Sequence, residues 1–391
     1  MKPAQIYYEQ AMALGEQGRS EAAMEACRKA LQLDPDHADA RVELACLLYD
    51  SGDMEGTILE CHRAIQLNRE DAFAWYELGL ALYRTEEMEA ARAAFQEVIR
   101  IDSNYTDAYA GLAGVLYVLG KIEEVIAAAK KAISLQPDHA LAYYYLGLAF
   151  SKRGNPPDAI EAYRQAVALD PDDREAHYNL ATLLDKQGDV EAAIGEYQEA
   201  ARLQPDDADI HCRLGIALYN NAQLDASAES FREALRLQPE TDKAYPYLGK
   251  ILDLQGDHKQ AAAFYQEALR RYPNWVAVYW EIGNLYYNLQ DYEQSATAFR
   301  EIVRLEPQNA KAHHSLGAAL HHLPGSLEEA IREYYQAISL DPHITRSYTN
   351  LGMALLTKGM LQEARAVWQM VLQLDDKEQA EKARDLLDRY R

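Results

Sequence analysis

Residues 140–173 read ALAYYYLGLAFSKRGNPPDAIEAYRQAVALDPDD, and residues 174–207 read REAHYNLATLLDKQGDVEAAIGEYQEAARLQPDD. Each segment has 34 residues, a glycine at its fifteenth position and Pro-Asp-Asp at its end. The spacing extends in both directions, because eight prolines keep the same phase, with one extra residue before the last: Pro35, Pro137, Pro171, Pro205, Pro239, Pro273, Pro307 and Pro342. A period of this length indicates a stack of small repeated units.

Counting outward in this phase predicts eleven tandem repeats, at 4–37, 38–71, 72–105, 106–139, 140–173, 174–207, 208–241, 242–275, 276–309, 310–344 and 345–378. They leave no room for a separate catalytic domain. In the remaining residues 379–391, the apolar positions Ala383, Leu386, Leu387 and Tyr390 follow a helical stripe. This pattern predicts a C-terminal capping helix, with a dimer contact as the alternative, so the chain is expected to be a monomer or a homodimer.

Each repeat has the pattern of two helices, here called A and B. Position 8 is always alanine or glycine, and positions 20 and 27 are mostly small. Bulky residues recur at positions 4, 7, 11 and 24, as in Trp75, Leu78, Leu82 and Phe95. Glycines near position 15 interrupt the helical spacing and predict a short turn. The small residues would let the helices approach closely, while the large ones fill the remaining space.

At these positions the sequence resembles the tetratricopeptide repeat (TPR) family, whose pattern is present in Trp75, Leu78, Gly79, Leu82, Ala91 and Phe95, and in Ala159, Tyr163, Ala166 and Pro171. The resemblance implies an all-α, right-handed superhelical solenoid with a concave groove lined mainly by A helices. The departures from the pattern are few. Arg69, Ser103 and Asp376 replace the terminal proline, and the tenth repeat gains a residue near Pro324 and Gly325, which we expect to lengthen its turn.

The composition narrows the possible functions of the chain. The 391 residues carry a net charge of −23, which disfavours binding to nucleic acid or anionic lipid. With neither a membrane-spanning run nor a signal peptide in the sequence, we expect a cytoplasmic protein. No motif of phosphate-binding loops, zinc hydrolases or serine hydrolases occurs, so neither an enzyme nor a cofactor is expected. The sequence has four cysteines and no CxxC pair, and we interpret them as reduced thiols that pack like small apolar residues: Cys27, Cys46, Cys61 and Cys212.

The densest histidine cluster is in the tenth repeat, at His313, His314, His321 and His322. His314 and His321 share a helix face but are two turns apart, about 10 Å, which is too far for one zinc ion. We therefore expect groove-lining or packed histidines that make the groove sensitive to pH near neutrality.

The candidate binding residues lie at positions 2, 5, 9, 12 and 13 of helix A, the stripe that lines the groove in the family. The stripe is rich in aromatic residues and changes from acidic in the first four repeats to basic in the last four. Asn284 and Asn288 are four residues apart and could bond a peptide backbone. The candidate partner-binding residues are Lys243, Lys250, Trp280, Asn284, Tyr287, Asn288, Lys311, His314, Arg346, Tyr144, Tyr178 and Tyr219.

These features predict a non-enzymatic scaffold that binds a partner polypeptide in its groove and helps to assemble a complex. The alternative is a substrate-recruiting arm for an enzyme, such as a glycosyltransferase, whose catalytic domain is on another chain. The lysine and asparagine pair of the chaperone carboxylate clamp is incomplete, because Trp280 precedes Asn284 where the clamp needs lysine. The asparagine ladder of the superhelical arm of O-linked N-acetylglucosamine transferase is matched only at Asn179 and Asn350.

Overall fold

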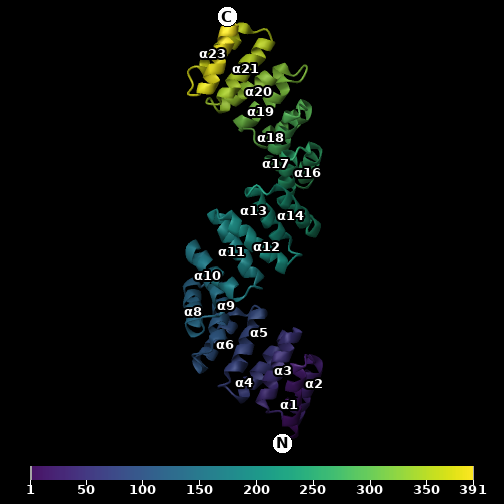
Figure 1. Ribbon diagram of the computed structural model, residues 1–391, viewed down its shortest axis with the longest axis vertical. Coiled ribbons are helices and arrows are strands. Elements are labelled where there is room, and N and C mark those ends of the chain that lie inside the picture. Colours follow the sequence, from purple (N-terminus) through teal and green to yellow (C-terminus); the bar gives the residue numbers. More distant parts are fainter. Residues whose placement is uncertain (1, 391) are drawn as a thin grey trace. The chain divides into compact units, whose positions relative to one another are not determined.

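The computed structural model describes residues 2–390, which contain twenty-three α-helices and no β-strand (Figure 1). The chain divides into two compact units, of which the first ends at Pro205 and the second begins at Asp206. The all-α fold predicted from the periodicity is therefore confirmed. None of the described helices combines the length and the apolar character that a membrane-spanning segment needs.

The helices of both units are short, about four turns or fewer each. The first unit contains α1 (Pro3–Glu16), α2 (Ser20–Leu33), α3 (Ala38–Ser51), α4 (Met54–Leu67), α5 (Ala72–Arg84), α6 (Met88–Ile101), α7 (Thr106–Val118), α8 (Ile122–Leu135), α9 (Ala140–Arg153), α10 (Pro156–Leu169), α11 (Arg174–Gln187) and α12 (Val190–Leu203). The second unit contains α13 (Ala208–Asn220), α14 (Leu224–Leu237), α15 (Ala244–Leu254), α16 (His258–Arg271), α17 (Val276–Asn288), α18 (Tyr292–Leu305), α19 (Ala310–His321), α20 (Leu327–Leu340), α21 (Thr345–Thr357), α22 (Leu361–Val371) and α23 (Lys377–Arg389).

Up to α22, the odd-numbered helices are A helices and the even-numbered ones are B helices. Within each unit, an A helix packs on the B helix that follows it, and that B helix packs on the next A helix. Every turn from A to B contains one residue in the left-handed conformation. Eight of these residues are glycines, such as Gly188, and the other three are Glu86, Ala222 and Gln290.

The small residue at position 8 of helix A makes room for the side chain at position 24 of helix B. A Cβ atom at Gly79 would lie 2.8 Å from Cε1 of Phe95, whose ring is almost fully buried. Gly147, Gly215, Gly249, Gly283, Gly317 and Gly352 meet an aromatic ring in the same way. Where position 24 is small, as at Cys27, Cys61 and Ala129, position 8 is alanine. The two positions are thus complementary in size, with one exception, the pair Ala181 and Tyr197.

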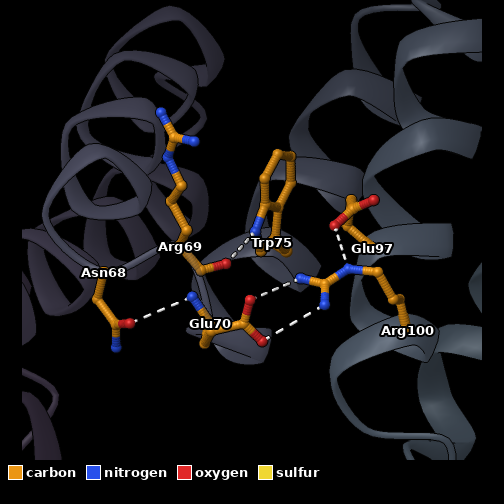
Figure 2. A network of polar contacts seen from close by, with 6 residues as sticks. All are labelled: Asn68, Arg69, Glu70, Trp75, Glu97 and Arg100. Atoms are coloured by element: carbon orange, nitrogen blue, oxygen red, sulfur yellow. Dashed lines mark hydrogen bonds and ion pairs between the residues drawn. The ribbon is translucent and has the colours of Figure 1, made fainter.

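A recurring hydrogen bond joins each of several repeats to the one before it. The Trp75 indole, at position 4 of its repeat, donates to the backbone oxygen of Arg69, at position 32 of the preceding repeat (Figure 2). Beside it, the Arg100 guanidinium binds Glu70 and Glu97 at 2.9 and 2.8 Å. The same backbone oxygen is contacted in other repeats by side chains of different types, in the pairs Arg41 and Pro35, Tyr109 and Ser103, His177 and Pro171, Tyr245 and Pro239, Tyr279 and Pro273, and His313 and Pro307.

The C-terminal helix α23 packs on the last helix pair. Ala383 is buried, and Leu386, Leu387 and Tyr390 pack against a cluster that includes Trp368. The helix, expected over 379–391, begins at Lys377, because the Asp376 carboxylate caps it by accepting a hydrogen bond from the backbone N–H of Gln379. In the tenth repeat the extra residue lies in the segment between α19 and α20, where Gly325 has a φ of 79°.

Candidate functional site

Two adjoining cavities lie in the second unit along the A helices α17, α19 and α21. The larger, of about 540 Å³, is lined by Trp280, Lys311, His314, Ser315, Asp341, His343, Ile344, Thr345 and Arg346. The smaller, of about 260 Å³, is lined by Asn284, Tyr287, Phe299, His314, Ser315, Ala318, Arg346 and Asn350. His314, Ser315 and Arg346 belong to both, so we treat the two together as the paired cavity. Six residues predicted from the helical stripe line it: Trp280, Asn284, Tyr287, Lys311, His314 and Arg346.

His314 lines both cavities. Its Nδ1 lies 2.8 Å from the hydroxyl oxygen of Ser347, and its ring centroid lies 5.9 Å from that of Tyr334. Burial, and secondarily the positive charge of Arg346, lowers the pKa of His314 to about 4. Burial also lowers the pKa of His321. His314 is therefore a neutral hydrogen-bonding group at physiological pH, so the expected sensitivity of the groove to pH near neutrality does not come from this residue.

The cations of the paired cavity are exposed at its rim. Lys311 forms no ion pair within residues 2–390. Arg346 helps to lower the pKa values of Asp376 and Glu378, although the hydrogen bonds of these carboxylates to other groups are the larger cause. One carboxylate, Asp341, lines the larger cavity. The larger cavity is thus lined by two cations, Lys311 and Arg346, and by one carboxylate. Because Lys311 has no ion-pair partner among the described residues, its ammonium group is available to a ligand.

Aromatic rings form the apolar wall. The ring of Trp280, which is half-buried, lies 5.5 Å from that of Phe299. The Tyr287 ring lies 5.4 Å from Tyr292 and 6.1 Å from His322. These contacts hold the rings in place before any ligand binds. The Asn284 side chain is exposed on α17, four residues after Trp280 and three before Tyr287, and it forms no hydrogen bond with the part of the chain that the structure describes.

Three predicted residues of the second unit lie outside the paired cavity. The Lys250 ammonium pairs with the Glu281 carboxylate at 2.8 Å, so its charge is already compensated. Lys243 is exposed at the N-cap of α15, and Asn288 is exposed as the last residue of α17. We therefore place the candidate site on six of these nine C-terminal residues.

The three predicted tyrosines also lie elsewhere. In the first unit, Tyr144 packs against Tyr145 and Tyr163, with ring centroids 5.5 and 6.1 Å away. Tyr178 lies 6.0 Å from Tyr197 in the same way. In the second unit, Tyr219 lies 5.2 Å from Tyr247. All three are half-buried, so each offers a ligand only part of its ring.

The sequence reasoning missed several residues of the paired cavity. Ser315 and Asn350 occupy position 6 of helix A, next to the predicted position 5. Asp341 and His343 belong to the segment that leads into α21. Position 6 could have been included, because it lies four residues from position 2 and three from position 9, on the same face of a helix. The segment before α21 gave no such signal.

The described residues contain neither a cluster of metal-binding side chains nor a thiol whose pKa favours reaction. No group of three or more histidine, cysteine or acidic side chains within residues 2–390 is arranged to hold a metal ion. The four cysteines are free thiols. Burial raises the pKa of Cys27 and Cys61 to about 12 and that of Cys212 to about 11, which keeps them protonated and unreactive at neutral pH.

Comparison with known proteins concerns the repeats and the fold. A family model described as "Tetratricopeptide repeat" matches residues 61–106, 147–208, 212–274 and 281–343, and two others with the same description match 4–37 and 128–161. No curated protein matches the sequence.

Among solved structures, the chain is similar to the C-terminal part of a TPR repeat-containing protein from Cytophaga hutchinsonii, with 21% identity over 62% of this chain and 99% of that one and a TM-score of 0.51. It is also similar to PilF of Pseudomonas aeruginosa, with 19% identity over 55% and 97% of the two chains and a TM-score of 0.50. These structures support the fold alone. Since the first family model by itself matches more than half of the residues, the chain belongs to the tetratricopeptide repeat family, whose members generally form non-catalytic scaffolds that bind peptides or proteins.

Proposed function

We propose that this protein is a non-enzymatic scaffold that binds an extended segment of a partner polypeptide along its A helices and thereby helps to assemble a complex. The observation that carries the proposal is the paired cavity, where three successive A helices contribute aromatic, amide and cationic side chains to one surface. In this proposal the eleven helix pairs are the repeat units with the boundaries predicted above. The cysteines, kept as free thiols, are compatible with the reducing cytoplasm.

The chemistry of the paired cavity favours a partner segment with a carboxylate. Lys311 and Arg346 at the rim can bind an acidic side chain or a chain terminus through charge-assisted hydrogen bonds. Trp280 offers a half-buried aromatic surface for the neighbouring side chain, and such anchors contribute much of the binding energy at protein interfaces. The Asn284 amide can both donate to and accept from a peptide backbone. His314, being neutral, adds a hydrogen bond without opposing the cations.

A binding experiment with the full chain tests this assignment. The probe is a short fluorescent peptide of alternating alanine and glutamate with a free carboxyl end, and its glutamine analogue serves as the uncharged reference. Because Lys311 and Arg346 are exposed, replacing either one with alanine should weaken binding only about fivefold. Lys259→Ala is the matched control, because Lys259 is exposed on the B helix α16, outside the paired cavity.

The same variants identify the natural partner. Affinity purification from cell extract, followed by mass spectrometry, should recover a partner with the wild-type chain and with Lys259→Ala but not with the Lys311→Ala, Arg346→Ala double variant. If both cavity variants bind the glutamate peptide as tightly as the control does, the paired cavity is not the binding site.

A further inference from the structure

Glu77 is a buried carboxylate in the first unit without a partner. It lies on the A helix α5 and is 8% exposed. Its side chain forms no hydrogen bond or ion pair within residues 2–390. Among these residues, however, every side-chain oxygen or nitrogen atom that is fully buried has a hydrogen-bond partner. The Glu77 carboxylate oxygens therefore keep contact with solvent, and the small exposed part of this residue includes its charged end.

The groups around Glu77 do not compensate its charge. Burial and the nearby Asp50 of α3 raise the pKa of Glu77 to about 7. Burial and Asp50 also raise the pKa of Glu43 on α3. The other titratable neighbours are Cys46 on α3, Cys61 on α4, Tyr76 on α5 and Tyr105 before α7, and each has a raised pKa that keeps it neutral at pH 7. Three carboxylates thus share one region without an ion pair to any of them.

A metal ion does not fit this region. The acidic and thiol side chains here do not come together as a group of three that could hold one. An organic cation fits better, because a single ammonium or guanidinium group needs only one or two carboxylates and tolerates aromatic neighbours. The cation that the structure places beside this region is Arg84 of α5, whose guanidinium lies 5.5 Å from the centre of the Tyr49 ring. Within residues 2–390 it forms no ion pair with Glu77 or Asp50.

We propose that the surface around Glu77 and Asp50 is a second binding site, which takes the lysine or arginine side chain of a partner polypeptide. The site is chemically opposite to the paired cavity and lies in the other unit, so it does not depend on the function proposed for that cavity. The incoming cation would form the ion pair that Glu77 lacks, with Asp50 as the exposed second carboxylate.

Proton release distinguishes this site from general attraction to an acidic protein. At pH 7, near the pKa of Glu77, the carboxyl is protonated in about half of the molecules. A bound cation favours the ionised form, so binding should release about half a proton for each peptide bound. Attraction to the exposed carboxylates of the outer surface releases none, because they are already ionised at this pH.

Titration calorimetry on the full chain measures both quantities. The probe is a short peptide of alternating alanine and lysine, titrated at pH 7 in phosphate and in Tris, whose different ionisation enthalpies reveal the protons released. Glu77→Gln should weaken binding about five- to tenfold and abolish the proton release. The matched control is Glu55→Gln, which removes the same charge from an exposed position on the B helix α4 and should change affinity less than about twofold.

Two further measurements complete the experiment. Circular dichroism should show that Glu77→Gln is folded, and this variant should bind the alanine-glutamate peptide of the previous section as the wild-type chain does, if that peptide binds at all. Asp50→Asn should also weaken binding of the lysine peptide. The proposal is overturned if Glu77→Gln and Glu55→Gln have equal effects on affinity, or if the wild-type chain binds the peptide without releasing protons.

Discussion

Replacing Gly79 with alanine should destabilise the first unit, whereas the same change at Gly195 should stabilise it. The added Cβ at Gly79 would lie 2.8 Å from Phe95 Cε1 and 3.0 Å from its Cδ1 and Cζ. On the side of α7 the ring lies close against the backbone of Gly111, where a built Cβ would be only 2.7 Å from Cζ, so the ring has little space to withdraw in that direction. Such overpacking costs about 1–3 kcal/mol, and the better helix propensity of alanine returns about 0.5–1 kcal/mol. We expect a net loss of about 1–2 kcal/mol.

Gly195 supplies the control, because it lies inside α12 and a Cβ there would meet no atom within 4 Å. Gly195→Ala should therefore raise the free energy of unfolding by about 0.5–1 kcal/mol. Urea denaturation followed by far-ultraviolet circular dichroism measures both variants. In a Phe95→Leu background, Gly79→Ala should lose most of its penalty, since the smaller side chain leaves space for the methyl group. If the denaturation midpoint moves in the same direction for both glycines, the packing argument is wrong.

Three further predictions concern stability. Glu77→Gln should raise the free energy of unfolding by about 3 kcal/mol at pH 8 but by less than about 1 kcal/mol at pH 5. The reason is that a carboxyl pKa raised from 4.5 to about 7 makes the stability of the wild-type protein fall as pH rises through that interval. Urea denaturation at both pH values measures this difference, and an equal gain at both would contradict it. Gln290→Gly should stabilise the second unit by about 0.5–1 kcal/mol, because glycine adopts the left-handed conformation at this position without the strain of a side chain. Gly188→Ala should destabilise the first unit by a similar amount for the opposite reason. Thermal melting of the two variants tests these opposite signs. Ala166→Phe should cost about 1–3 kcal/mol, because Ala166 is fully buried at a helix crossing, and an unchanged melting curve would contradict the assigned phase.

The periodicity of the sequence was enough to predict the fold class, because each repeat needs its neighbours to bury its apolar residues. Local geometry was harder to predict. Glu86, Ala222 and Gln290 adopt the left-handed conformation although none is glycine, because the packing of the A and B helices that each turn joins fixes the conformation of the turn. The size complementarity of Gly79 and Phe95 became visible only when the structure brought positions 8 and 24 together.

The candidate site could be predicted only in part. The stripe on a single helix grouped Trp280 with Lys311 and Arg346, and the three line one cavity, because equivalent positions of successive A helices face the same side. It could not show that Lys250 is neutralised by Glu281, since that contact joins two different A helices. The buried carboxylate of Glu77 was missed for a similar reason, because burial depends on the neighbouring helices and not on the residue type.

The hydrogen bond at the repeat junction bears on how this chain tolerates mutation. Guanidinium, indole, phenol and imidazole groups all reach the same backbone oxygen, as Arg41, Trp75, Tyr245 and His313 do. The acceptor belongs to the main chain, so no substitution can remove it, and selection need only retain a side chain that is long enough and has a proton to donate. Repeats can therefore drift apart in sequence, one position at a time, while the junctions that have this bond keep their geometry.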